Sequence, residues 1–110
     1  MSSDKTRKIR ALNDDLRRTF TGGRVMMTVG VKALPPDTRA HVCQAVQGFT
    51  SFDADNDPHG EHDFGSVEVD GQKFFWKIDY FDKALEYGSE DPSDPEQTTR
   101  IMTIMTVREY

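Results

Sequence analysis

The residues of this chain that could do chemistry are concentrated between positions 53 and 65. This segment reads Asp-Ala-Asp-Asn-Asp-Pro-His-Gly-Glu-His-Asp-Phe-Gly, and it holds four aspartates, one glutamate and two histidines. Apolar stretches precede and follow it. A loop that only connects two elements needs no such density of acid and imidazole groups. Any catalytic, metal or binding site is therefore expected here first.

One interpretation of this segment is a metal site. His59, His62 and Asp57 could offer nitrogen and oxygen ligands to zinc, nickel or manganese, with Glu61 or Asp63 as further ligands. The proline and glycine between these residues argue against a helix, so the two imidazoles need not face the same way. A divalent metal is therefore an alternative, and we expect no obligatory cofactor.

The same segment also begins like a calcium-binding loop. Asp53, Asp55 and Asp57 have the spacing of the first three ligands of that motif. However, Pro58 stands where the motif needs glycine, and Phe64 stands where it needs a bidentate acid. The sequence therefore excludes a calcium loop of this type.

A second interpretation is general acid–base catalysis by His62 with Glu61 or Asp63. A histidine beside carboxylates can shuttle protons near neutral pH. However, the chain has no glycine-flanked serine elbow, no phosphate-cradling glycine loop, and no cysteine near this segment. Without a nucleophile, an enzyme centred on His62 stays the alternative function, and no catalytic residue is assigned.

The two remaining interpretations of the segment are a self-bonded turn and a docking surface. Asp and Asn side chains can bond their own backbone and fix a turn without any ligand. Acidic loops on a rigid scaffold are also common recognition elements. The sequence leaves both of these readings open.

Charge is distributed unevenly along the 110 residues, whose net charge is −5. Residues 1–24 hold seven basic and three acidic side chains, whereas residues 53–96 hold fourteen acidic ones and three lysines. Such an acidic region repels nucleic acid and attracts basic proteins. Direct nucleic-acid binding is therefore disfavoured and would depend on the arginines of the first helix alone.

Six segments are expected to form regular elements. Residues 4–20 have helical periodicity, residues 24–32 alternate like a strand, and Pro35-Pro36-Asp37 opens a second helix. Asp70-Gly71 predicts a hairpin between strands at 64–69 and 74–81, and residues 100–107 form a last strand. We therefore expect one α+β domain over residues 1–110, with two helices on a mainly antiparallel sheet of about four strands. Residues 1–3 are expected to lie outside its ordered part.

The first helix is predicted to turn one apolar stripe to the core. This stripe consists of Ile9, Leu12, Leu16 and Phe20. The arginines are expected on the opposite, solvated side, and these are Arg7, Arg10, Arg17 and Arg18.

The strand at 74–81 carries apolar residues on both faces. Phe74, Trp76, Ile78 and Tyr80 are expected in the core. Phe75 and Phe81 point the other way, where they could anchor a partner. Four methionines, Met26, Met27, Met102 and Met105, are expected in the core of neighbouring strands, with an edge-paired homodimer as an alternative.

The cellular setting follows from what the sequence lacks. Cys43 is the only cysteine, which excludes an intramolecular disulfide. The sequence has no apolar leader and no stretch long enough to span a membrane. We expect a soluble cytoplasmic protein.

Several motifs resemble those of one bacterial family. They are Asn56-Asp57-Pro58-His59-Gly60-Glu61-His62-Asp63-Phe64-Gly65, Trp76-Lys77-Ile78-Asp79-Tyr80, Gly88-Ser89-Glu90-Asp91-Pro92 and Thr98-Thr99-Arg100. The family is a domain of unknown function found on alphaproteobacterial chromosomes, plasmids and prophages. The resemblance runs from about Ile9 to Tyr110.

This resemblance implies no established activity. In the family pattern tyrosine can take the place of His59, which implies that a two-histidine metal site is not general, while Glu61, His62 and Asp63 remain candidates. The mobile-element setting implies a role in plasmid or phage biology. Small acidic proteins of that setting include inhibitors of host defence complexes, anti-CRISPR proteins among them.

Charge and resemblance together predict a non-enzymatic binding protein that engages a basic, nucleic-acid-handling partner. Carboxylates would pair with lysines and arginines of that partner and would make association sensitive to salt. The residues expected to carry this contact are Asp53, Asp55, Asp57, Glu86, Glu90, Asp91, Phe75 and Phe81.

Overall fold

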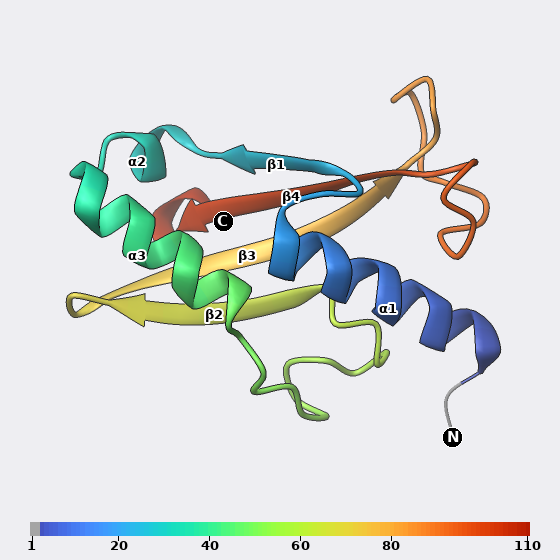
Figure 1. The fold of residues 1–110 in the computed structure, drawn as a ribbon, viewed down its shortest axis with the longest axis horizontal. Helices are drawn as coiled ribbons and strands as arrows, with labels where there is room; N and C mark the ends of the chain where they lie inside the picture. Colours follow the sequence, from blue (N-terminus) through green and yellow to red (C-terminus); the bar gives the residue numbers. More distant parts are fainter. Residues whose placement is uncertain (1–2) are drawn as a thin grey trace.

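The computed structural model describes residues 3–110 and confirms the α+β class (Figure 1). Its elements follow in the order α1 (Asp4–Thr19), β1 (Arg24–Met27), α2 (Val29–Lys32), α3 (Pro36–Gln47), β2 (Phe64–Val69), β3 (Gln72–Phe81), β4 (Thr99–Thr106) and the 3-10 helix η1 (Val107–Glu109). In the part of the chain described, no helix is long and apolar enough to cross a membrane.

The four strands form one mixed sheet in the order β1-β4-β3-β2. β2 pairs antiparallel with β3, and β3 pairs antiparallel with β4, whereas β1 pairs parallel with β4. Asp70 and Gly71 link β2 to β3 with φ angles of 53° and 77°, as the Asp-Gly signal predicts. The longest strands are therefore central, and the short strand β1 lies at one edge.

The first helix begins and ends at identifiable capping residues. Ser3 is the N-cap, and its side chain accepts a hydrogen bond from the Thr6 backbone N–H. Phe20 ends the helix in a left-handed conformation with φ 58°. Residues 1–3 are expected to lie outside the ordered part, but Ser3 caps α1 and belongs to it. Residues 1 and 2 lie outside the described residues.

The prediction of one strand over residues 24–32 is wrong beyond Met27. Val29 to Lys32 form the helical turn α2, in which Val29 is 80% exposed and Val31 is buried. The alternation of valines is too short to separate a strand from a helical turn. Distant contacts decide the outcome, because the Glu109 side chain accepts hydrogen bonds from the Gly30 N–H and the Thr28 hydroxyl.

The core lies between the helices and one face of the sheet. Figure 1 shows α1 and α3 on the same face of the sheet. The buried core residues are Leu16, Val31, Val42, Val46, Phe74, Trp76, Ile78, Met102 and Ile104. The predicted inward face of β3 is thereby confirmed for its three buried members, and Tyr80 packs against the cluster from a half-buried position.

The opposite face of the sheet, called here the open face, lacks such a helical layer within residues 3–110. The strand register places Phe75, Lys77, Asp79 and Phe81 of β3 on it. Met26 also lies on this face, opposite Thr103, and is 49% exposed. The expectation that Met26 belongs to the core is therefore wrong.

Candidate functional site

The histidine of the acidic segment contacts the first helix. His62 Nδ1 lies 2.8 Å from Asp14 Oδ1 of α1, and its Nε2 lies 3.7 Å from Asp57 Oδ2. The His62 backbone N–H also donates to Asp57 Oδ1 at 3.1 Å. The imidazole is therefore held between two carboxylates, and Asp14, not Glu61 or Asp63, is the acid that orients it.

Aromatic rings and a buried guanidinium complete this cluster. The Phe52 ring stacks on the His62 imidazole with centroids 3.7 Å apart and planes within 3°. Arg17 Cζ lies 5.2 Å from the Phe52 ring centroid and 5.5 Å from that of Trp76. Arg17 Nη1 donates to Asp14 Oδ1 at 2.8 Å.

Arg17 is 1% exposed, so its assignment to the solvated face of α1 is wrong. It lies at the border of the apolar stripe, about a quarter turn from the stripe's centre at roughly 100° per residue. The ion pair with Asp14 and the contacts with the aromatic faces offset the cost of burying its charge. Its Nε has no hydrogen-bond partner among residues 3–110.

The ionisation of Asp14 reflects these contacts. Burial by itself raises the pKa of this carboxyl, but the hydrogen bonds from Arg17 and His62 outweigh it and hold the pKa below its usual value. Asp14 is therefore charged at neutral pH and acts as a fixed acceptor for both partners.

A second polar cluster, beside the first, centres on Asn13. Its Nδ2 donates to the Glu61 carbonyl at 3.0 Å and to the Tyr80 hydroxyl at 2.7 Å. Its Oδ1 accepts from Arg100 Nε at 2.9 Å, and the Tyr80 hydroxyl donates to Glu61 Oε1 at 2.8 Å. Asn13 is fully buried, so one side chain joins α1, the acidic segment and strands β3 and β4.

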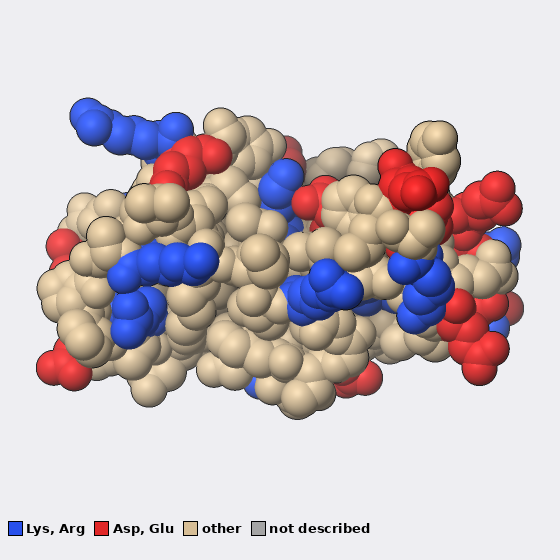
Figure 2. Space-filling model, turned by 90° about the horizontal axis from the view of Figure 1, so that it is seen from above, with Lys and Arg blue, Asp and Glu red and all other residues tan. Residues whose placement is uncertain are grey.

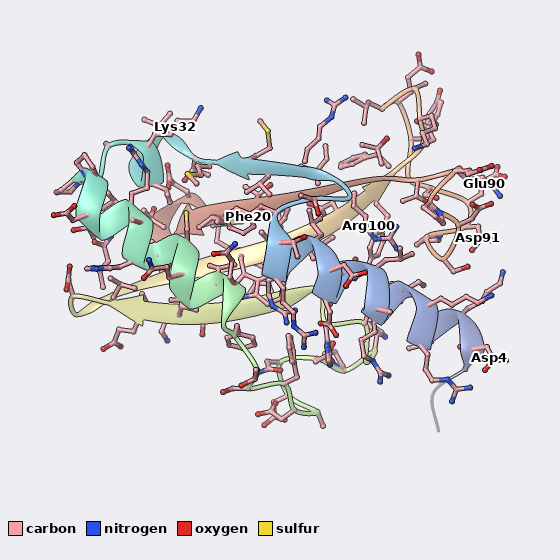
Figure 3. All side chains as sticks on the ribbon, in the orientation of Figure 1. Asp4, Phe20, Lys32, Glu90, Asp91 and Arg100 are labelled. Atoms are coloured by element: carbon pink, nitrogen blue, oxygen red, sulfur yellow. The ribbon has the colours of Figure 1, made fainter. Side chains whose placement is uncertain are left out.

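Sequence reasoning missed Asn13, Asp14, Tyr80 and Arg100 as members of the site. A signal existed for Asn13, because it lies next to the apolar stripe of α1 and asparagine is a poor helix former. Burial raises the pKa of Tyr80 well above its usual value. The hydroxyl therefore stays protonated and donates a hydrogen bond to the Glu61 carboxylate. Figure 3 shows Arg100 reaching from β4 toward α1.

The acids at the start of the segment bond their own backbone. Asp53 Oδ1 accepts from the N–H groups of Asp55 and Asn56, and Asn56 Oδ1 accepts from the Asp53 N–H. Asp53 and Asp55 stay exposed, whereas Asp57 is buried and its carboxylate turns to His62. This arrangement matches the self-bonded turn among the interpretations of the segment.

The proposed metal ligands do not converge. His62 is engaged by Asp14, and His59 is exposed beside a shallow hollow that Asp57 and Gly60 also line. Over residues 3–110, no group of three or more His, Cys, Asp or Glu side chains lies close enough to hold a metal ion. Asp63 is half-buried, and burial together with Glu61 raises its pKa.

The second acidic segment, between β3 and β4, forms an ordered loop. Asp82 accepts the Glu86 N–H with its side chain and the Leu85 N–H with its carbonyl, and its own N–H donates to the Tyr87 carbonyl at 2.8 Å. Tyr87 is 74% exposed at the end of this turn. Beyond it, Asp91 accepts from Ser93 and lies 3.8 Å from Lys5 of α1.

Acids of this loop gather at one end of the molecule. Figure 3 places Glu90 and Asp91 at the same end as Asp4. In Figure 2, acidic side chains cluster at this end with lysine or arginine side chains beside them. The charge asymmetry along the chain is therefore only partly preserved on the surface, because the basic helix α1 runs beside the acidic loops.

The two phenylalanines predicted as partner anchors are half-buried on the open face. Phe75 packs against Phe64 and Tyr110 with ring centroids 5.4 and 5.2 Å apart. Phe81 ends β3 and forms an isolated bridge with Gly88. The loop after β3 therefore begins where the open face ends.

Comparison with known proteins identifies a family and nothing more specific. A family model described as "Protein of unknown function (DUF3768)" matches residues 27–109. No curated protein and no solved structure matches the chain. The matched range includes the acidic segment and most of the sheet, but it begins after α1, which supplies Asn13, Asp14 and Arg17.

Proposed function

We propose that this chain, which belongs to the DUF3768 family of proteins of unknown function, is a non-enzymatic binding protein that engages a basic protein partner. The observation that carries this proposal is the exposed Tyr87 on the ordered acidic turn 82–87. Tyrosine is among the residues that most often dominate binding energy at interfaces.

The turn is held in place before any partner arrives. The Asp82 contacts close it, and the Ser89 N–H donates to the Tyr80 carbonyl, which joins the end of the turn back to β3. Leu85, 39% exposed, has a positive φ of 60°, a conformation that a non-glycine residue adopts only when its surroundings impose it. A preorganised loop loses little conformational entropy on binding.

The surroundings of Tyr87 favour a basic partner. A hollow of about 430 Å³ beside it is lined by the acidic Asp82, Glu90 and Glu96 and by the basic Lys83. A lysine or arginine of the partner could enter this hollow, pair with Glu90 or Glu96 and contact the Tyr87 ring. In this proposal Tyr87 and Leu85 take over the anchoring role first expected of Phe75 and Phe81.

The partner we propose is a protein that handles nucleic acid. Its phosphate-binding groove is lined with the cations that this loop would attract, and carboxylates spaced along the loop would take the place of phosphates. The mobile-element setting implied by the sequence resemblance supports the same choice. In that setting the chain would act as an inhibitor of anti-CRISPR type.

Affinity capture from host cells with matched variants tests the proposal. The tagged protein should retain a basic protein at low salt and release it at high salt. Tyr87→Ala combined with Glu90→Gln should lose that protein, whereas Asp70→Asn, which removes an exposed carboxylate at the hairpin turn, should keep it. Equal capture by all three proteins would rule out this loop as the docking element.

A second candidate function is acid–base catalysis, favoured by the pairing of Asp14 with His62. A carboxylate on Nδ1 is the arrangement that fixes the tautomer and orientation of a catalytic imidazole. The positive φ of 56° at His62 is also typical of a residue held for function. If His62 is catalytic, His62→Ala should abolish an activity while the stability of the protein stays unchanged.

A further inference from the structure

The side chains that β3 presents on the open face of the sheet are complementary to those of an antiparallel copy of the same strand. From Phe75 to the end of β3, the side chains on this face are Phe75, Lys77, Asp79 and Phe81. We propose that a second copy of this chain binds here, in a twofold dimer whose sheets pack face to face. This inference is independent of the acidic loop and of its proposed partner.

The order of the four residues supports a twofold arrangement. If two β3 strands cross antiparallel with the axis beside Ile78, Lys77 of one copy faces Asp79 of the other, and Phe75 faces Phe81. A twofold interface requires such reciprocity, because each contact occurs twice with the partners exchanged. When the strand Phe-Lys-Asp-Phe faces an antiparallel copy of itself, each phenylalanine meets a phenylalanine and each lysine meets an aspartate.

The charges already present on this face suit a copy of itself. Lys77 Nζ lies 3.3 Å from Asp79 Oδ2 within one chain, and the two side chains are 43% and 42% exposed. In the dimer the four groups would form a ring of alternating charge. Each ion would gain a second partner as it leaves water, which offsets the cost of removing it.

The whole open face is close to electrical balance although the protein is acidic. Its charged residues on the strands are Arg24, Lys73, Lys77, Glu68 and Asp79. Three basic and two acidic groups give little attraction for nucleic acid or for a strongly basic surface. A second copy meets no net repulsion here, unlike at the acidic loops.

Apolar residues surround this charged centre. Phe64, Phe75 and Tyr110 form an aromatic cluster at one end of the face, with ring centroids 5.2 to 5.8 Å apart. Tyr110 is 73% exposed, and Met26, toward the β1 edge, is 49% exposed. Packed sheets in sandwiches bury such faces against each other with strands crossing at about 30°.

Charge-reversal variants of Lys77 and Asp79 test whether a dimer uses this face of the sheet or another surface. Sedimentation velocity over a concentration series should show a monomer–dimer equilibrium for the wild type. Lys77→Glu and Asp79→Lys should each weaken the dimer about 100-fold or more, because each places like charges opposite one another. The combined variant Lys77→Glu with Asp79→Lys should restore dimerisation, because it exchanges the two charges.

Lys32→Glu, which makes the same charge change at the exposed end of α2, is the matched control and should dimerise like the wild type. A monomer at every concentration would overturn the proposal. So would a dimer that neither reversal weakens, or a combined variant that dimerises no better than the single ones. Circular dichroism of each variant confirms that the fold is retained.

Discussion

Asp14 and His62 lie 48 residues apart in the sequence, and their side chains meet at 2.8 Å. The contact joins the middle of α1 to the end of the acidic segment. The imidazole is also covered by the Phe52 ring and approached by the Asp57 carboxylate. This geometry favours a role in fixing the segment against the helix, and it makes that role measurable.

Replacement of His62 by alanine should lower the free energy of unfolding by about 1–3 kcal/mol. The variant loses a hydrogen bond to a charged carboxylate and the stacked ring, and it leaves Asp14 with one partner fewer. Urea unfolding followed by tryptophan fluorescence measures the change. His59→Ala in the same segment is the control, and because His59 is exposed the change should stay within about 0.5 kcal/mol. Equal stability of the two variants would contradict the anchoring role of His62.

Replacement of Asn13 by alanine should cost more, about 2–3 kcal/mol, because it removes two donated hydrogen bonds and one accepted bond at a buried position. The Arg100 guanidinium loses an acceptor in an environment where burial already lowers its pKa. Thermal unfolding compares this variant with Gln44→Ala, which removes an amide from the exposed side of α3. If both variants unfold at the same temperature, Asn13 does not join α1 to the acidic segment, β3 and β4 in solution.

The fold and the candidate site differ in how far the sequence could predict them. The hairpin at Asp70-Gly71 and the inward face of β3 follow from local rules, namely turn chemistry and a period of two. The contacts of Asn13 with Tyr80 and Arg100 depend on strands 67 and 87 residues away. No local pattern encodes such contacts, because they form only after the sheet and helix have packed. The composition of the acidic segment points to His62 as a candidate, but the acid that orients His62 is Asp14 of α1, which no local pattern connects to that segment.

Replacement of Gly65 by alanine should destabilise the protein by about 1–3 kcal/mol through overpacking. A Cβ at this position would lie 2.6 Å from Nε1 of the buried Trp76 and 2.9 Å from Cε1 of the half-buried Phe49. Gly48→Ala is the matched control, because its nearest neighbour would be the Gln44 carbonyl at 3.4 Å and its φ of −89° suits any residue. Denaturant midpoints compare the two variants. A neutral Gly65→Ala would show that the Trp76 indole moves freely aside.

Acid should loosen the C-terminal anchor through Glu109. The hydroxyl of Thr28 and the N–H groups of Gly30 and Thr106 donate to this carboxylate and lower its pKa from 4.5 to about 2. Since the pKa is lower in the folded state, the stabilisation is complete above pH 4.5 and is lost as the pH falls toward 2.

The stability difference between the wild type and Glu109→Gln should therefore be largest at neutral pH and should shrink steadily below pH 4.5. Carbon-detected NMR of the Glu109 carboxyl gives its pKa directly. Thr28→Val removes the hydroxyl donor and should raise that pKa toward 4.5. If the wild-type Glu109 titrates near pH 4.5, η1 is not held against α2 in solution. The contacts of Glu109 would then not explain why residues 29–32 form a helical turn and not a strand.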